Sequence, residues 1–325
     1  MSRRTLWMLL LYAACIGLAA YFVLIKADWT ALLELDLGTF FSIIALTAFY
    51  VVVHTRLAQT LLQSSGHRPG LSRVYLVLTA SMSANYAAPV KIGMPVQVWL
   101  YKQVLSIPVP IGLAVVAVEF FLSLVLPLIF SIAGSLVIFP EQSAKPLLFG
   151  GGLVLLVAMS FVLWKPQWFL GLLDCPRLKK PISHLSRHVQ EFQTGIRRLS
   201  VGTILQVVAL LLLMYLVSAW RLTLILKAFG WQASITDLVL AQLTSFTLGS
   251  LSMLPMGLGV RDISLAFLLT RLGIPLQVAT LAAVIERSVT TGTTALLGII
   301  SINVLGMMGF NIRKKPSRRL DDSET

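Results

Sequence analysis

The stretch LPMGLGVRD, residues 254–262, places a proline, two glycines and an Arg–Asp pair between two apolar segments. Residues 236–254 before it are apolar or small and polar, and residues 263–310 after it are mostly apolar. Glycine lets a backbone bend sharply and approach a ligand closely, and proline ends the helix that precedes it. We therefore predict that one helix stops near Pro255 and that another begins near Gly259.

The surrounding chain has the composition of an α-helical membrane protein. Of its 325 residues 57% are hydrophobic and 12% are charged, about half the charged share of a soluble protein. We predict an all-α, polytopic helical bundle in one integral membrane domain, residues 1–310, followed by a short cytoplasmic tail, residues 311–325. The apolar runs near the 20 or so residues that cross a bilayer are 5–25, 37–55, 107–139, 147–164, 201–226 and 275–310.

The formal net charge of +13 has two explanations, nucleic-acid binding and the enrichment of Lys and Arg in cytoplasmic loops. With the N-terminus inside, 19 of the 26 basic residues fall in cytoplasmic segments, which are 3–4, 56–73, 91–102, 165–200 and 313–319. The second explanation therefore accounts for the charge. We predict a multi-pass protein of a bacterial-type inner membrane with both termini and the basic loop 165–200 in the cytoplasm, and no nucleic-acid partner.

The chain contains an internal repeat, with units of about 72–139 and 236–310. Each unit has a proline, a glycine, an Ile-Pro pair and then an acid, in the same order. The matched residues, at offsets of 166 or 167, are Pro89 with Pro255, Gly93 with Gly259, Pro108 with Pro275 and Glu119 with Glu286.

In each unit a short segment with polar side chains follows the break. We predict that residues 74–105 and 238–272 are re-entrant hairpins whose tips lie near Pro89 and Pro255, in addition to about six full spans. Backbone broken at membrane depth is tolerated where protein or a water-filled cavity surrounds it. The span count places the two hairpins on opposite membrane faces, so the units are inverted. Inverted repeats with interrupted segments indicate a transport site near the bilayer midplane.

The helix that begins near Gly259 offers free backbone N–H groups, which favour an anion, and Arg261 adds positive charge. A lipid phosphate is the natural ligand in a membrane. Predicted lipid- or phosphate-binding residues are Asn85, Lys91, Gly93, Glu119, Gly257, Gly259, Arg261, Asp262, Glu286 and Arg287, with helix breaks at Pro89 and Pro255.

Acids inside long spans are costly and are functional candidates by default. For Glu119 and Glu286 the alternatives are a structural ion pair or a protonated helix contact. For Lys91 the alternative is a lysine that reaches to the membrane interface. We expect Arg221, late in its span, to be such an interfacial anchor, and we assign no role to His54. No spacing typical of a metal site is present.

These residues resemble the transmembrane family named for lysylphosphatidylglycerol synthase, also called the flippase-like domain family, over roughly 5–310. The family's second-half motif reads Pro-Gly-Gly-Leu-Gly-Val-Arg-Glu, and here Met256 and Asp262 are the departures from it. Its first-half motif reads Asn-x-x-x-Pro-x-Arg-x-Gly-Glu, and here Met94 stands in place of the acid. The residues that match are Asn85, Pro89, Lys91, Gly93, Pro255, Gly257, Leu258, Gly259, Val260 and Arg261.

The resemblance implies a domain that moves lipid across the membrane. We favour a flippase-like transporter of an anionic phospholipid or a polyprenyl-phosphate-linked precursor, which is not an enzyme and has no cofactor. The alternatives are a membrane-embedded lipid-phosphate transferase or hydrolase, and a non-catalytic partner of an envelope glycosyltransferase. The expected partner is membrane lipid, with an envelope-biosynthesis enzyme as a second candidate. In the multiple peptide resistance factors, a membrane domain of this kind is followed by a soluble aminoacyl-transferase domain. Because the chain ends at Thr325, we expect no such domain here. The oligomeric state stays open.

Overall fold

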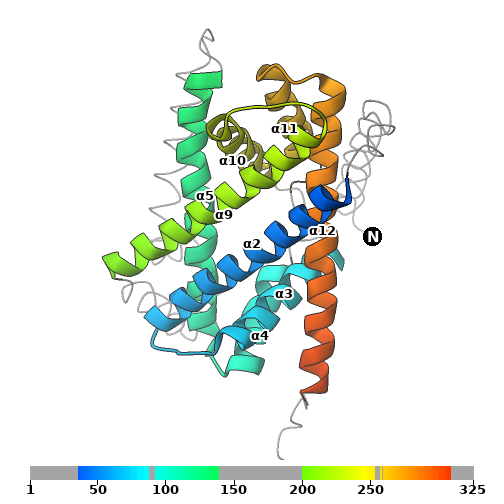
Figure 1. Ribbon diagram of the computed structural model, residues 1–325. Coiled ribbons are helices and arrows are strands. Elements are labelled where there is room, and N and C mark those ends of the chain that lie inside the picture. Colours follow the sequence, from blue (N-terminus) through cyan, green and yellow to red (C-terminus); the bar gives the residue numbers. More distant parts are fainter. Residues whose placement is uncertain (1–35, 88–91, 139–199, 253–256, 258, 309–325) are drawn as a thin grey trace, which may run out of the picture.

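The computed structural model describes residues 36–87, 92–138, 200–252, 257 and 259–308, which form eight helices and no strand (Figure 1). In chain order the helices are α2 (Leu37–Ser64), α3 (Leu71–Ala87), α4 (Gly93–Leu105), α5 (Val109–Ile138), α9 (Val201–Ala228), α10 (Ile235–Leu251), α11 (Val260–Arg271) and α12 (Leu276–Met307). The predicted runs 5–25 and 147–164, nearly all of the loop 165–200, and the tail 311–325 lie outside the described residues.

Four of these helices are long and apolar enough to cross a membrane, namely α2, α5 over Val109–Ile132, α9 and α12. They coincide with four of the predicted spans. Helix α2 continues to Ser64, beyond the predicted end at residue 55. In this extension Gln59 and Thr60 are buried, whereas Arg56 and Gln63 are exposed. The amide of Gln59 donates to the carbonyl of Pro69 at 2.9 Å, so the buried polar groups of the extension have partners within the protein.

The remaining four helices are short and occur in two pairs. Helices α3 and α4 have 17 and 13 residues, and α10 and α11 have 17 and 12. All four fall below the length of about 20 residues that spans a bilayer. Within each pair the two helices pack against each other.

The chain between α10 and α11 breaks at two glycines. Gly257 has φ 65° and Gly259 has φ 78°, a region that side-chain-bearing residues rarely adopt. A Cβ atom on Gly257 would also lie 2.8 Å from the Cα of Gly249 on α10. Glycine at 257 is thus required both for the backbone angle and for close contact. The predicted start of a helix near Gly259 is confirmed, whereas Pro89 and Pro255 lie outside the described residues.

The eight helices repeat one four-helix pattern. Helices α2 to α5 have 28, 17, 13 and 30 residues, and α9 to α12 have 28, 17, 12 and 32. The first helix of each set is capped alike, with Asp36 accepting from the Thr39 N–H and Ser200 from the Thr203 N–H, both at 3.1 Å. Each unit therefore includes one more helix than the sequence matches at 72–139 and 236–310 indicated.

The two units lie in opposite orientations (Figure 1). The pair α3–α4 is at the lower end of the view and the pair α10–α11 at the upper end, and α5 and α12 run in opposite directions. The units also exchange contacts: α2 packs on α9, α12 packs on α3, and α5 packs on α10. Each unit has its own apolar core, built mainly from its own four helices.

Candidate functional site

A cavity of about 350 Å³ is lined by helices of both units. Six of the predicted site residues line it, which are Asn85, Gly93, Glu119, Gly257, Arg261 and Arg287. The other polar residues of its wall, for which no site role was predicted, include His54, Gln97, Arg221 and Gln242. The cavity thus brings together the breaks of both units and both long acid-bearing helices.

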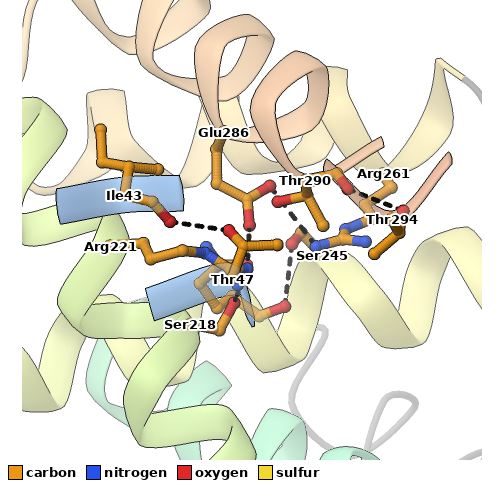
Figure 2. A network of polar contacts seen from close by, with 10 residues as sticks. Ile43, Thr47, Ser218, Arg221, Ser245, Arg261, Glu286, Thr290 and Thr294 are labelled. Carbon is orange, nitrogen blue, oxygen red and sulfur yellow. Dashed lines mark hydrogen bonds and ion pairs between the residues drawn. The ribbon is translucent and has the colours of Figure 1, made fainter. Parts of the chain in front are cut away.

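The most deeply buried charges of the described part are Arg221 on α9 and Glu286 on α12. Each side chain is 2% exposed, and Arg221 Nη2 lies 2.8 Å from Glu286 Oε1 (Figure 2). The same Nη2 atom donates to the Ser218 hydroxyl at 3.2 Å. This corrects the expectation that Arg221 is an interfacial anchor. Helix α9 turns this position toward α12, and the carboxylate of Glu286 offsets the cost of burying the guanidinium.

Arg221 has hydrogen-bonding capacity to spare. Within the described part of the chain, its Nε and Nη1 atoms are buried and have no hydrogen-bond partner. Its guanidinium lies over the ring of Tyr50, with Cζ 5.4 Å from the ring centroid, which is a cation–π contact. A buried guanidinium with unused donors on a cavity wall is suited to an anionic ligand.

A second arginine approaches Glu286 from α11. Arg261 Nη2 lies 3.6 Å from Glu286 Oε2, so the one carboxylate lies between two guanidinium groups (Figure 2). The Arg261 side chain is 20% exposed and lines the cavity, whereas Glu286 lies behind the two arginines and does not line it. Arg287, next along α12, lines the same space. The structural ion pair considered for Glu286 is therefore present, and it carries excess positive charge on its cavity side.

The corresponding acid of the first unit, Glu119, has a different partner. His54 Nε2 on α2 lies 2.5 Å from Glu119 Oε1 on α5. Both residues line the cavity, so His54, for which no role was expected, is part of the candidate site. A sequence signal did exist, because His54 precedes Glu119 by 65 positions, the same spacing that separates Arg221 from Glu286.

The predicted residues near the first break serve its backbone. Asn85, near the end of α3, accepts a hydrogen bond through Oδ1 from the N–H of Gly93 at 2.7 Å. A Cβ atom on Gly93 would collide with the Asn85 side chain. Asn85 and Gly93 therefore hold the start of α4 against α3 while lining the cavity. Lys91 lies outside the described residues.

At the second break, Asp262 caps its own helix. The Gly259 N–H donates to Asp262 Oδ2 at 3.3 Å. Neither residue lines the cavity, and the carboxylate lies at the helix N-terminus where an anionic ligand was predicted to bind. In the structure, the positive groups that line the cavity are therefore arginine side chains, and not the backbone N–H groups at the start of this helix.

Among the described residues, three arginines and one glutamate, Glu119, line the cavity. Two of these arginines, Arg221 and Arg261, share the single carboxylate of Glu286 behind them, and this arrangement favours an anionic ligand. In the same residues no group of three or more His, Cys, Asp or Glu side chains is placed to hold a metal ion. A buried guanidinium wall of this kind suits a phosphate or a carboxylate, which accepts several N–H donors at once.

Comparison with known proteins places the chain in one family. Searches of curated proteins and of solved structures gave no significant match. The family described as the lysylphosphatidylglycerol synthase transmembrane region matches residues 5–298, which is most of the chain. The protein is thus a multi-pass membrane protein of lipid-related type, and it belongs to the lysylphosphatidylglycerol synthase transmembrane family.

Proposed function

We propose that the protein is a flippase-like transporter that moves a lipid with an anionic headgroup, a phospholipid or a polyprenyl-phosphate-linked precursor, across the membrane. The observation that carries this proposal is the cavity of about 350 Å³ lined by Arg221, Arg261 and Arg287. Its size is at the lower end of small-molecule sites, which suits a headgroup while the acyl or prenyl chains stay in the bilayer.

The cost of burying charge supports this proposal. A charged side chain at the centre of a membrane helix costs at least about 2.5–3.5 kcal/mol. Arg221 and Arg261 share the one carboxylate of Glu286, whereas the second carboxylate, Glu119, pairs with His54. A phosphate in the cavity would add the missing negative charge and accept from the unused donors of Arg221.

The repeat supports a mechanism of alternating access. In this proposal the helix pairs α3–α4 and α10–α11 are re-entrant hairpins that enter from opposite faces and meet at the cavity. Both termini and the loop 165–200 face the cytoplasm of an inner membrane, as the distribution of basic residues indicates. Rocking of one unit against the other opens the cavity to each leaflet in turn. The protein makes and breaks no covalent bond in this scheme.

Reconstitution tests the proposal. Purified protein is placed in liposomes with phosphatidylglycerol that carries a fluorescent label on its headgroup, and movement between leaflets is followed by quenching from outside. We expect movement with the parent and with Arg271→Met, which removes an exposed arginine at the far end of α11 that does not line the cavity. We expect none with Arg261→Met.

Three outcomes separate the alternatives. Chemical conversion of the labelled lipid indicates a transferase or hydrolase. Absence of both movement and conversion in the parent removes the transporter proposal and favours a non-catalytic partner of an envelope enzyme. Equal movement by Arg261→Met and the parent removes the arginine-lined cavity as the site.

A further inference from the structure

We infer that the cavity contains a proton-binding site at His54 and Glu119, and that a proton is taken up together with the anionic headgroup. This inference rests on the proposed transport function and adds to it the coupling ion. The pair joins α2 to α5 through the 2.5 Å contact between His54 Nε2 and Glu119 Oε1, and both side chains line the cavity.

The pair has a vacant position for a proton. When Nε2 donates to the ionised carboxylate, the Nδ1 atom of His54 is left as an acceptor. Among the contacts of the described residues, neither His54 Nδ1 nor Glu119 Oε2 has a hydrogen-bond partner, and both atoms are buried. Protonation of Nδ1 changes the net charge of the pair from −1 to zero, so the cavity gains one positive charge.

The internal repeat relates the His54–Glu119 pair of the first unit to the Arg221–Glu286 pair of the second. Arg221–Glu286 and His54–Glu119 each join the first long helix of a unit to its last, with the same spacing of 65 positions. An arginine does not lose its proton in proteins, whereas a histidine titrates near neutral pH. One unit therefore holds a permanent charge pair and the other holds a pair whose charge can change.

The surroundings link this proton to an anionic ligand. Tyr50 packs edge-on against His54, with ring centroids 6.3 Å apart. The guanidinium of Arg221 lies over the same Tyr50 ring. Proton uptake by His54 therefore adds charge to a region that is already positive. An anion in the cavity removes this repulsion, and by linkage a protonated His54 strengthens anion binding to the same extent.

The other groups near the pair fit this assignment. Helices α3 and α10 contribute only uncharged side chains to the cavity among the described residues. Tyr101 is near enough to Glu119 for an electrostatic interaction between them, and it receives a hydrogen bond from Gln97 at 2.8 Å. The other titratable and charged groups that line the cavity with the pair are Tyr50 on α2, Tyr215 and Arg221 on α9, Arg261 on α11 and Arg287 on α12. Behind this wall, Tyr101 on α4 interacts with Glu119, and Glu286 on α12 pairs with Arg221 and Arg261.

The test uses the same liposomes and labelled phosphatidylglycerol, with imposed gradients. One proton moving with one anionic lipid carries no net charge. A gradient of one pH unit, with the voltage clamped at zero, should shift the steady-state distribution of labelled lipid about tenfold toward the alkaline side. A membrane potential alone should leave the distribution unchanged. An uncoupled anion transporter behaves in the opposite way, with about a tenfold shift for each 59 mV and none for a pH gradient.

Variants locate the proton site. His54→Gln retains an N–H that can reach Glu119. In this variant we expect the steady-state distribution of labelled lipid to be unchanged by the pH gradient and to change with the membrane potential. His67→Gln removes a histidine that does not line the cavity, and it should respond to the pH gradient as the parent does. A parent that moves lipid without responding to the pH gradient overturns the proton site and leaves the transport proposal intact.

A separate measurement covers the case in which no lipid moves, which would remove the transport proposal. Histidine signals are followed by NMR in the detergent-solubilised protein, with His54→Gln used for assignment. At a fixed pH, we expect sn-glycerol 3-phosphate to shift the His54 signals toward those of a protonated imidazole. Signals of His54 that are unaffected by this anion overturn the proton site by themselves.

Discussion

The ion-pair network around Glu286 predicts an unequal response to the removal of its members. Replacement of Glu286 by Gln leaves Arg221, which is 2% exposed, as a buried charge with Ser218 as its only other hydrogen-bonded partner among the described contacts. Loss of one partner from a buried pair costs about 3–5 kcal/mol. Replacement of Arg221 by Met leaves Glu286 beside Arg261 at 3.6 Å, so we expect only the loss of a hydrogen bond to a charged group, about 1.5–3 kcal/mol.

The double variant distinguishes coupling from simple loss of contacts. With Arg221→Met and Glu286→Gln together, neither buried charge of the close pair remains, and the total cost should be well below the sum of the two single costs. The free energy of unfolding is measured by reversible titration with SDS in mixed micelles. Additive costs, or a larger cost for Arg221→Met than for Glu286→Gln, would refute the view that Glu286 is shared between two arginines.

Three further predictions follow from the site, the break and the charge distribution. Arg261→Lys should retain part of the lipid movement that Arg261→Met loses, because the charge remains without the forked geometry; equal loss in both contradicts this. Gly257→Ala should lower thermal stability and transport more than Gly273→Ala, since both positions have positive φ but only 257 also collides with Gly249. Equal effects would show that backbone strain alone matters. In a cysteine-free background, Thr30→Cys should react with an impermeant thiol reagent from outside the cell and Lys180→Cys should not; the reverse pattern would invert the topology.

Much of the fold could be predicted from composition and local chemistry. A helix of about 20 apolar residues is the stable solution in a bilayer because it satisfies its own backbone hydrogen bonds. This reasoning located α2, α5, α9 and α12. Glycines at 257 and 259 located the start of α11, since few other residues adopt positive φ. The spacing of prolines, glycines and acids predicted the internal repeat. It did not predict that each repeat unit begins with a further helix, α2 or α9.

The site could be predicted only in part. Glu119, Glu286 and Arg261 stood out because charged residues are rare within apolar spans. Asp262 was a predicted ligand-binding residue, but in the structure it caps α11, a local role that the residue type alone does not distinguish from binding. His54 and Arg221 were set aside, and they proved to be the partners of the two acids.

The reason lies in the solvent of this protein. Amphipathic helices of soluble proteins reveal their buried face by periodicity, but lipid is as apolar as a protein core, so the periodic signal is weak. The sequence by itself determined that the chain enters the membrane, where its helices break and which acids lie within its spans. Only the packing of α2 and α9 against the acid-bearing helices decided that His54 and Arg221 turn inward, because the rotation of a helix about its axis is set by its neighbours.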